Sequence, residues 1–338
     1  MTDNSQLEQA AELCIGALSQ AVLDDVAIYN KSQDKEPKLL SLVAELRMDA
    51  IFINMDLCTS YVACCKVNDS FACRFHLKNL DASMHEAYKV LLGYGRSRRY
   101  TIWTRVGEAL NDKPVCDWEE HPQLISTYQT LSEKLEKLAG EETDKAHREL
   151  TYHYNADMKQ VYYYTVSVNS IEEASVKYIA YADVLNGMMK LCEDIERCFK
   201  NKGYSTAVDV EPKSMDDSLH LTLIQYLSKN KELPIVLNGI LNDVKPIDDY
   251  VQHLEKFKKL NGLVNNTIEL PEVDNVFVML NLYLIVLFMR ADMAAITKTF
   301  LLSKTSGEAM LNMRRYVITT TAAFGHLYGY SEDRKSVV

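Results

Sequence analysis

Glycine and proline are scarce in this sequence, with 12 glycines and seven prolines among 338 residues. Both residue types mark turns and chain breaks, and an architecture of many short strands needs them often. Alternation of apolar and polar residues is also rare, whereas long stretches carry apolar residues at helical spacing. We therefore exclude a sheet-based architecture and expect an all-α protein. A chain of this length forms one large or two small domains.

Paired cysteines and long apolar segments are also missing. The eight cysteines include no Cys-x-x-Cys pair of the kind that holds zinc, and no secretory signal precedes them. The longest apolar run, Val276 to Met289, is interrupted by Asn281 and falls short of the roughly twenty residues that span a bilayer. We expect free thiols in a reducing cytoplasm, no metal, cofactor or membrane contact, and a core or interface role for this run.

The sequence also lacks an excess of basic residues, since its formal net charge is −10. Proteins that coat nucleic acid displace counterions with many basic groups, so this class is disfavoured. One local segment nevertheless combines basic and aromatic residues that suit phosphates and stacked bases, namely Arg96, Arg98, Arg99, Trp103 and Arg105. Either these residues contact RNA, or the segment is a solvated loop in which Trp103 anchors the next helix in the core.

The apolar spacing predicts a succession of helices separated by polar breaks. The expected helical ranges are 6–30, 39–67, 70–92, 97–110, 119–139, 142–167, 171–200, 218–229, 232–242, 246–261, 273–303 and 307–328. The breaks divide the chain into an N-terminal helix (1–35), a helical bundle (36–200), a linker (201–217) and a C-terminal helical region (218–338).

Two pairs of predicted helices resemble each other when the sequence is shifted by 236 residues. The matching residues are Leu46 and Leu282, Phe52 and Phe288, Asp56 and Asp292, Ser70 and Ser306, Ala87 and Ala323, Leu91 and Leu327, Gly93 and Gly329, and Tyr94 and Tyr330. Both pairs follow the order helix, serine cap, helix, Gly-Tyr, and Asp69 or Ser70 can cap the second helix of the first pair. Either the C-terminal region partly repeats the first helical hairpin, or the two are alike because amphipathic hairpins share a pattern.

Arg148 and His153 form the one pair in which a phosphate-binding group lies close in sequence to a proton-transfer group. On a regular helix they lie roughly 140° apart, so they converge only through the long arginine, a distorted turn or a partner chain. The alternative is structural, because Glu149 and His153 are four residues apart, as are Arg148 and Tyr152. Such pairs stabilise solvated helices.

The run Arg148 to Met158 resembles the signature of the HEPN superfamily of small all-helical proteins. Members carry an arginine and, after four to six positions, a histidine. Many are ribonucleases of toxin, abortive-infection and CRISPR-associated systems, with an active site where two motifs meet in a dimer. The resemblance implies a HEPN-like bundle with additional C-terminal helices. It also implies that Arg148 binds the scissile phosphate and that His153 transfers protons while the ribose 2′-hydroxyl attacks phosphorus, without a metal.

Two functions are therefore expected. The first is a cytoplasmic, metal-independent endoribonuclease, as a toxin or antiphage effector, in which Tyr152, Tyr154 and Asn155 shape the pocket. The single motif in the chain then calls for a homodimer or a protein partner, and an antitoxin is a further expected partner. The second is a catalytically inactive helical protein that binds RNA or another protein. Glu149, whose charge repels a phosphate, and the acidic composition favour this alternative.

Other candidate residues give weaker signals. Asp81, His85 and Glu86 could reach a common ion from one helix, although they lack the Glu-x-x-His pairs of a di-iron bundle. A surface cluster is the other interpretation. His326 lies in an apolar setting that is typical of a core or cap histidine. The sequence contains no glycine-rich phosphate loop and no nucleophile elbow.

Overall fold

The computed structural model of the protein describes residues 6–18, 21, 38–93, 100–111, 121–141, 164–165, 170–201, 219–243, 249–253, 256, 259 and 271–327. These residues are almost entirely helical and include no strand, so the predicted all-α fold is confirmed. The helices are α2 (Lys38–Lys66), α3 (Ser70–Leu92), α4 (Ile102–Leu110), α5 (Pro122–Glu141), α8 (Ile171–Asn201), α9 (Leu219–Leu227), α10 (Leu233–Asn242), α12 (Pro271–Leu301) and α13 (Ser306–Leu327). Of the helices described, none has the length and apolar character needed to cross a membrane.

The hairpin of α2 and α3 has the boundaries that its capping residues dictate. The side chain of Asp69 accepts hydrogen bonds from the backbone N–H groups of Phe71 and Ala72, so Asp69 is the N-cap and Ser70 is the first residue of α3. This satisfies donors that the first helical turn leaves free. Gly93 ends α3 with a φ of 66°, a left-handed conformation that glycine adopts without steric cost.

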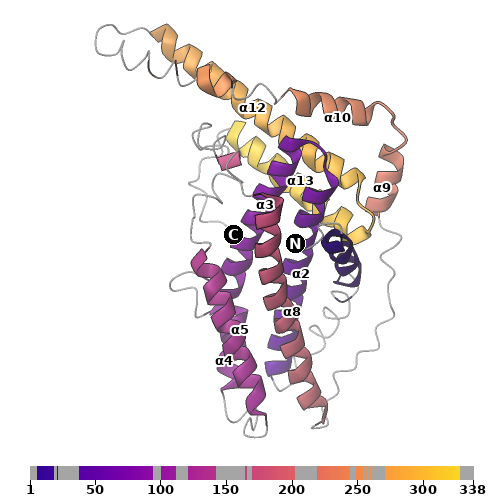
Figure 1. Ribbon diagram of the computed structural model, residues 1–338, viewed down its shortest axis with the longest axis vertical. Coiled ribbons are helices and arrows are strands. Elements are labelled where there is room, and N and C mark those ends of the chain that lie inside the picture. The colour runs from indigo at the N-terminus through magenta and orange to yellow at the C-terminus, as the bar shows by residue number, and fades with distance from the viewer. Residues whose placement is uncertain are drawn as a thin grey trace.

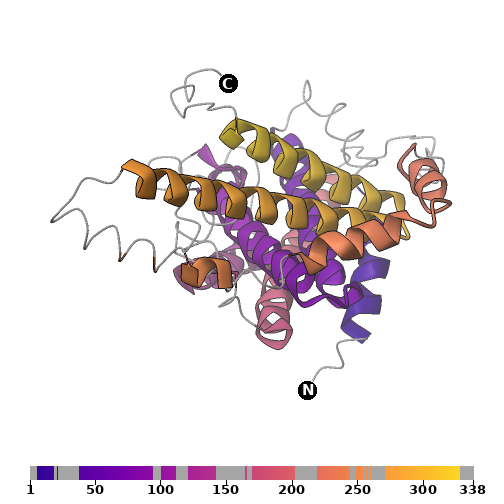
Figure 2. The ribbon, with the colours of Figure 1, turned by 90° about the horizontal axis from the view of Figure 1, so that it is seen from above.

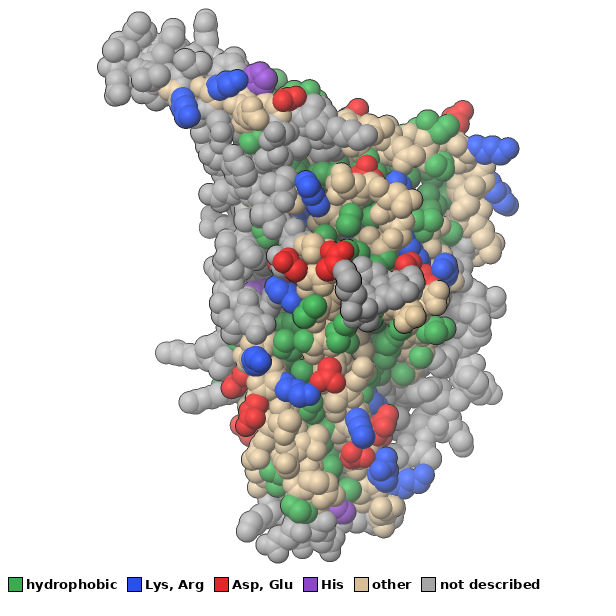
Figure 3. Space-filling model, viewed as in Figure 1, with side chains coloured by type: hydrophobic (Ala, Val, Ile, Leu, Met, Phe, Trp, Pro, Cys, Tyr) green, Lys and Arg blue, Asp and Glu red, His purple; other side chains and the backbone are tan. Residues whose placement is uncertain are grey.

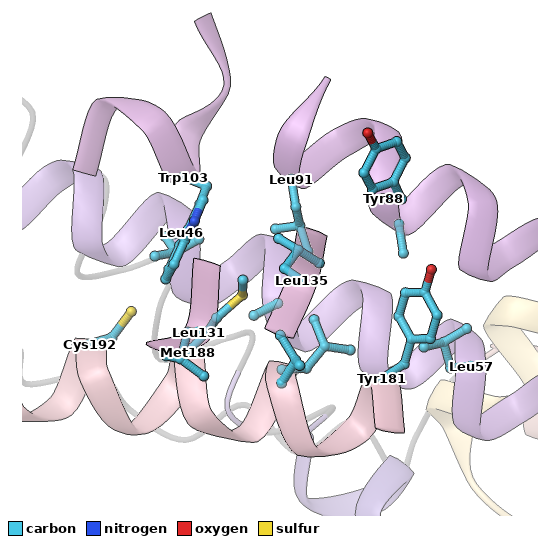
Figure 4. Close-up of a cluster of buried hydrophobic side chains, with 14 of the residues drawn as sticks. Leu46, Leu57, Tyr88, Leu91, Trp103, Leu131, Leu135, Tyr181, Met188 and Cys192 are labelled. Atoms are coloured by element: carbon cyan, nitrogen blue, oxygen red, sulfur yellow. The ribbon is translucent and has the colours of Figure 1, made fainter. Parts of the chain in front are cut away.

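The larger core lies within the bundle that α2 forms with α3, α4, α5 and α8 (Figure 1). Figure 4 shows how side chains from these helices converge, with Leu46 from α2, Leu91 from α3 and Met188 from α8 around one centre. All three are fully buried or nearly so. Each side chain of this size contributes about 1.5 to 3 kcal/mol when it leaves water, so this cluster is the main source of stability in the bundle.

A second hairpin, α12 and α13, crosses one end of the bundle and is flanked by α9 and α10 (Figures 1 and 2). Its core is separate from the first and combines Leu284, Phe288 and Ala295 of α12 with Leu241 of α10 and Phe75 of α3. The long apolar run therefore does serve as a core helix. Its other face is open, however, because Met279, Leu282, Tyr283 and Val286 are exposed.

The two hairpins have nearly the same boundaries when shifted by 236 residues. Ranges 38–66 and 70–92 then correspond to 274–302 and 306–328, which differ from α12 and α13 by three residues at most. Ser306 is the first residue of α13, as Ser70 is of α3, and the backbone N–H of Glu308 donates to the hydroxyl of the preceding Thr305. In both hairpins the cap is thus the residue before the serine.

A buried ion pair joins the two hairpins at the end of α2. The Lys66 ammonium lies 2.8 Å from Glu308 of α13 and 2.9 Å from Glu12 of the N-terminal helix (residues 6–18). Burial alone would lower the pKa of Lys66, but the bonds to Glu308 and Glu12 outweigh it and raise the pKa. Lys304 reaches Glu12 as well, at 2.9 Å. The predicted N-terminal and C-terminal regions are therefore tied to each other through α2.

His76 of α3 is fully buried where α3 meets the second hairpin. Burial lowers the pKa of His76 to about 3, and the positive charge of Arg315 adds to the decrease. The folded protein keeps this ring neutral at pH values where the unfolded chain, with a histidine pKa near 6.5, binds a proton. Acidification below that value therefore favours unfolding.

We predict that Lys66→Met lowers the free energy of unfolding by about 3 kcal/mol, because Glu308 would remain buried without its cation. The double variant Lys66→Met/Glu308→Gln should regain at least half of this loss, since glutamine is uncharged and can still accept from the backbone N–H of Lys304, as Glu308 does. Urea denaturation monitored by circular dichroism measures both values.

The matched control is Lys134→Met, which removes an exposed pair with Asp183. Its expected cost is below about 1 kcal/mol. A double variant that is no more stable than Lys66→Met would show that the buried charge on Glu308 is not what makes the single substitution costly.

A candidate binding groove between three helices

The predicted ribonuclease residues fall outside the part of the chain that the structure describes. This holds for Arg148, Glu149, Tyr152, His153, Tyr154 and Asn155, and for Arg96, Arg98 and Arg99 of the basic segment. Their roles therefore stay predictions from the sequence. Figure 3 shows one face of the molecule, and among its described side chains basic and acidic groups are interspersed rather than gathered in a basic patch.

Trp103 and Arg105 of the basic segment are described, and both have partners inside the protein. Trp103 is 1% exposed, stacks on Tyr128 with ring centroids 4.4 Å apart, and donates its indole N–H to Ser132. The ring of Trp103 is thus enclosed and anchors α4 in the core, which leaves no face for a nucleic-acid base. Arg105 lies 3.6 Å from Glu45 of α2.

The acidic and histidine residues of α3 do not converge on a common ion. Asp81 accepts a hydrogen bond from the hydroxyl of Tyr164 and lies 3.7 Å from Lys177, while His85 is buried. Glu86 lies 3.6 Å from Lys89. Among the described residues, no group of three or more histidine, cysteine or acidic side chains could hold a metal ion. The described cysteines all have free thiols.

A groove of about 720 Å³ lies between α2, α3 and α13. Asp49, Phe52, Ile53 and Asp56 line it from α2, spaced at i, i+3, i+4 and i+7, which places them on one face of the helix. From α3 and α13 the lining residues are Asn79, Ser83, Glu86, Ala87, Val90, Arg314, Arg315, Val317, Ile318, Thr319, Thr321 and Ala322. The residues that line it therefore span more than 270 positions of the chain, from 49 to 322.

Arg315 and Asp56 form the charged base of this groove. Arg315 is 8% exposed, and its guanidinium donates to the backbone carbonyl of Asp56 at 2.8 Å and to the hydroxyl of Ser60. Its charge lies 3.6 Å from the Asp56 carboxylate, and Arg314 approaches the same carboxylate at 3.2 Å. Two arginines of α13 therefore contact the single carboxylate of Asp56, and these contacts hold α13 against α2.

Asp49 is the lining carboxylate that stays without a cation. Among the described residues it has neither a hydrogen-bond partner nor an ion pair, although it is half-buried. Burial raises the pKa of Asp49 to about 6, and the negative charge of Glu45 contributes to the increase. An ionised carboxylate in this position lacks both full hydration and a counter-ion, which is the state that binding of a cation would relieve.

The walls of the groove are apolar and open to solvent. Phe52 is 38% exposed, Val90 45%, Val317 56% and Ile318 41%. Exposed apolar side chains are ordinary when they occur singly, but a group of them around one cavity marks a binding surface. Pockets of about 300 to 1,000 Å³ with apolar walls and a few polar groups are typical sites for small ligands.

Comparison of the chain with protein-family models, curated proteins and solved structures gives no match. The groove and the sequence patterns are therefore the features that bear on function.

The sequence patterns do not predict this groove. Its one local signal is the i, i+3, i+4, i+7 row of Asp49, Phe52, Ile53 and Asp56, where carboxylates flank apolar residues on one helical face. The opposite wall contains Val317 and Ile318, and its sequence pattern does not differ from that of an apolar helix face that packs into a core. Only the packing of α13 on α2 and α3 shows that these faces meet around open space.

We predict that Asp49→Asn stabilises the protein by on the order of 1 to 2 kcal/mol near neutral pH, a value already reduced for the partial exposure of the side chain. The folded pKa of about 6 lies above the ordinary value of 3.8, so ionisation of Asp49 opposes folding. The penalty is fully present above about pH 6 and disappears as the pH falls toward 3.8.

Urea denaturation at several pH values tests this. The stability gained by Asp49→Asn should be largest at neutral pH and should shrink steadily on acidification through the window between the two pKa values. A gain that does not depend on pH would show that the ionised carboxylate is not the cause.

Proposed function

We propose that this protein is a helical binding protein whose binding surface is the groove between α2, α3 and α13. The observation that carries the proposal is the half-buried, unpaired carboxylate of Asp49 within a cavity that has exposed apolar walls. A carboxyl group in this state costs folding free energy, so it is a feature that a bound partner explains better than stability does.

The chemistry of the groove favours binding over covalent catalysis. No cysteine, histidine or metal-ligating cluster is among its described lining residues, and its serine, Ser83, has no histidine beside it in the lining. Arg314 and Arg315 are already engaged by Asp56, and the unpaired carboxylate of Asp49 repels a phosphate backbone, so RNA is not the expected occupant of this surface.

Titration with the neutral fluorescent dye Nile red tests the proposal, because the dye brightens in apolar pockets. Wild type should bind it at one saturable site. Val317→Asp places a charge on the groove wall and should weaken dye binding at least about fivefold, as expected when a charge replaces apolar contact surface. Val317 is 56% exposed, so the fold should tolerate the change.

The control is Val176→Asp, which makes the same substitution at an exposed valine of α8 that does not line the groove. It should bind the dye like wild type. The proposal fails if wild type shows no saturable site, or if the two variants lose affinity equally.

The run Arg148 to Met158 supports a second candidate function, that of a HEPN-like, metal-independent endoribonuclease acting as a homodimer in toxin or antiphage defence. The observation in its favour is the spacing of Arg148 and His153, which supplies a phosphate-binding cation and a group that titrates near neutral pH. Glu149 beside the arginine weighs against activity, because its charge repels a phosphate.

For this candidate we predict that purified protein cleaves RNA in excess EDTA and that Arg148→Ala and His153→Ala each lower the rate at least about a hundredfold, the usual scale for losing a charge-stabilising group or an acid-base group. Arg197→Ala, which removes an exposed arginine of α8 paired with Asp194, should keep full activity. Cleavage that survives both motif substitutions, or no cleavage at high protein concentration, would exclude this mechanism for the isolated protein.

A further inference from the structure

We propose that the groove binds a small organic monocation with an apolar body, and that Asp49 is its counter-ion. This inference rests on the proposed binding function and specifies the class of ligand. It follows from the charge, the size and the apolar walls of the groove.

The charged groups of the groove are unevenly paired, and Asp49 is the carboxylate that no cation contacts. Arg314 and Arg315 both contact Asp56, and Glu86 lies 3.6 Å from Lys89. Asp49 has no partner among the described residues, and the neighbouring Glu45 on the preceding turn of α2 is itself paired with Arg105. The second arginine on Asp56 offsets Asp49 in number but does not contact it, so an occupant that pairs directly with Asp49 carries a positive charge. An anion placed beside Asp49 would meet repulsion instead.

The size and lining of the groove decide what kind of cation fits. A volume of about 720 Å³ is much larger than an ion and matches the range found for small organic ligands. Phe52, Val90, Val317 and Ile318 offer apolar contacts that a hydrated metal ion cannot use. An amine or guanidine attached to an aromatic or alkyl body can satisfy both Asp49 and these walls.

The position of Asp49 makes its charge selective. It lies on the same helical face as Phe52 and Ile53, so a ligand whose body contacts these side chains carries its cationic end beside the carboxylate. Because Asp49 is half-buried, an ion pair there is screened less by solvent than a pair on the open surface. The bound cation also removes the penalty of leaving this carboxylate unpaired.

Displacement of Nile red at about pH 8, where Asp49 is ionised and a primary amine is protonated, tests the inference. The competing ligands are phenylbutylamine, phenylbutanol and phenylbutyrate, which share one apolar body and differ in charge. Wild type should bind the amine at least about fivefold more tightly than the alcohol, the scale of one partly screened ion pair, and the carboxylate most weakly.

Two variants assign the preference to Asp49. Asp49→Asn should bind the amine and the alcohol equally. Glu45→Gln removes a neighbouring negative charge outside the groove lining and should keep the preference for the amine. If the dye binds at the groove but the amine has no advantage over the alcohol, or if its advantage survives Asp49→Asn, the inference is overturned while the proposed binding function stands. If the dye does not bind at the groove, the proposed binding function itself is wrong.

Discussion

The placement of the second hairpin on the bundle depends on the contact of α13 with α2, where charged groups are buried between two apolar hairpins. Lys66 pairs with Glu308 at one end of this contact, and Arg315 pairs with Asp56 in its middle. Each of these charges is costly to remove from water unless its partner is present, so the two pairs favour one register of α13 on α2. That register determines where every other side chain of α13 lies relative to α2 and α3.

The groove is a consequence of this register. Arg315 reaches across to the backbone of Asp56 and to Ser60, which brings α13 close to α2 at the base of the groove. Beyond this point, Phe52, Val90, Val317 and Ile318 face open space instead of one another. The same packing leaves Asp49 without a cation, because the arginines of α13 are already engaged by Asp56. Apolar walls and an unpaired carboxylate therefore arise together from one helical contact.

The two hairpins show that the same local pattern acquires different roles in different surroundings. Leu46 is fully buried in the bundle, whereas the corresponding Leu282 is 41% exposed. Phe52 lines the groove, whereas the corresponding Phe288 is buried against α10 and α3. The helices and caps are alike, but α8 packs beside the first hairpin and α10 beside the second. Burial is thus a property of the neighbours that a helix finds, and an internal sequence match does not specify it.

For the residues that the structure describes, the sequence by itself determined the helical class and the extents of the long helices, because these depend on local spacing, on the cap at Asp69 and on glycine at Gly93. The predicted helix over 142–167 lies almost entirely outside them and stays a prediction. It also indicated that Trp103 could anchor α4, one of the two roles that a tryptophan beside arginines suggests. Only the tertiary structure decided which charges are paired and which apolar faces stay open. The local sequence of a helix does not specify which helices pack against it. The groove forms only where three helices that are distant in sequence meet. The isolation of Asp49 is therefore visible only in the folded protein.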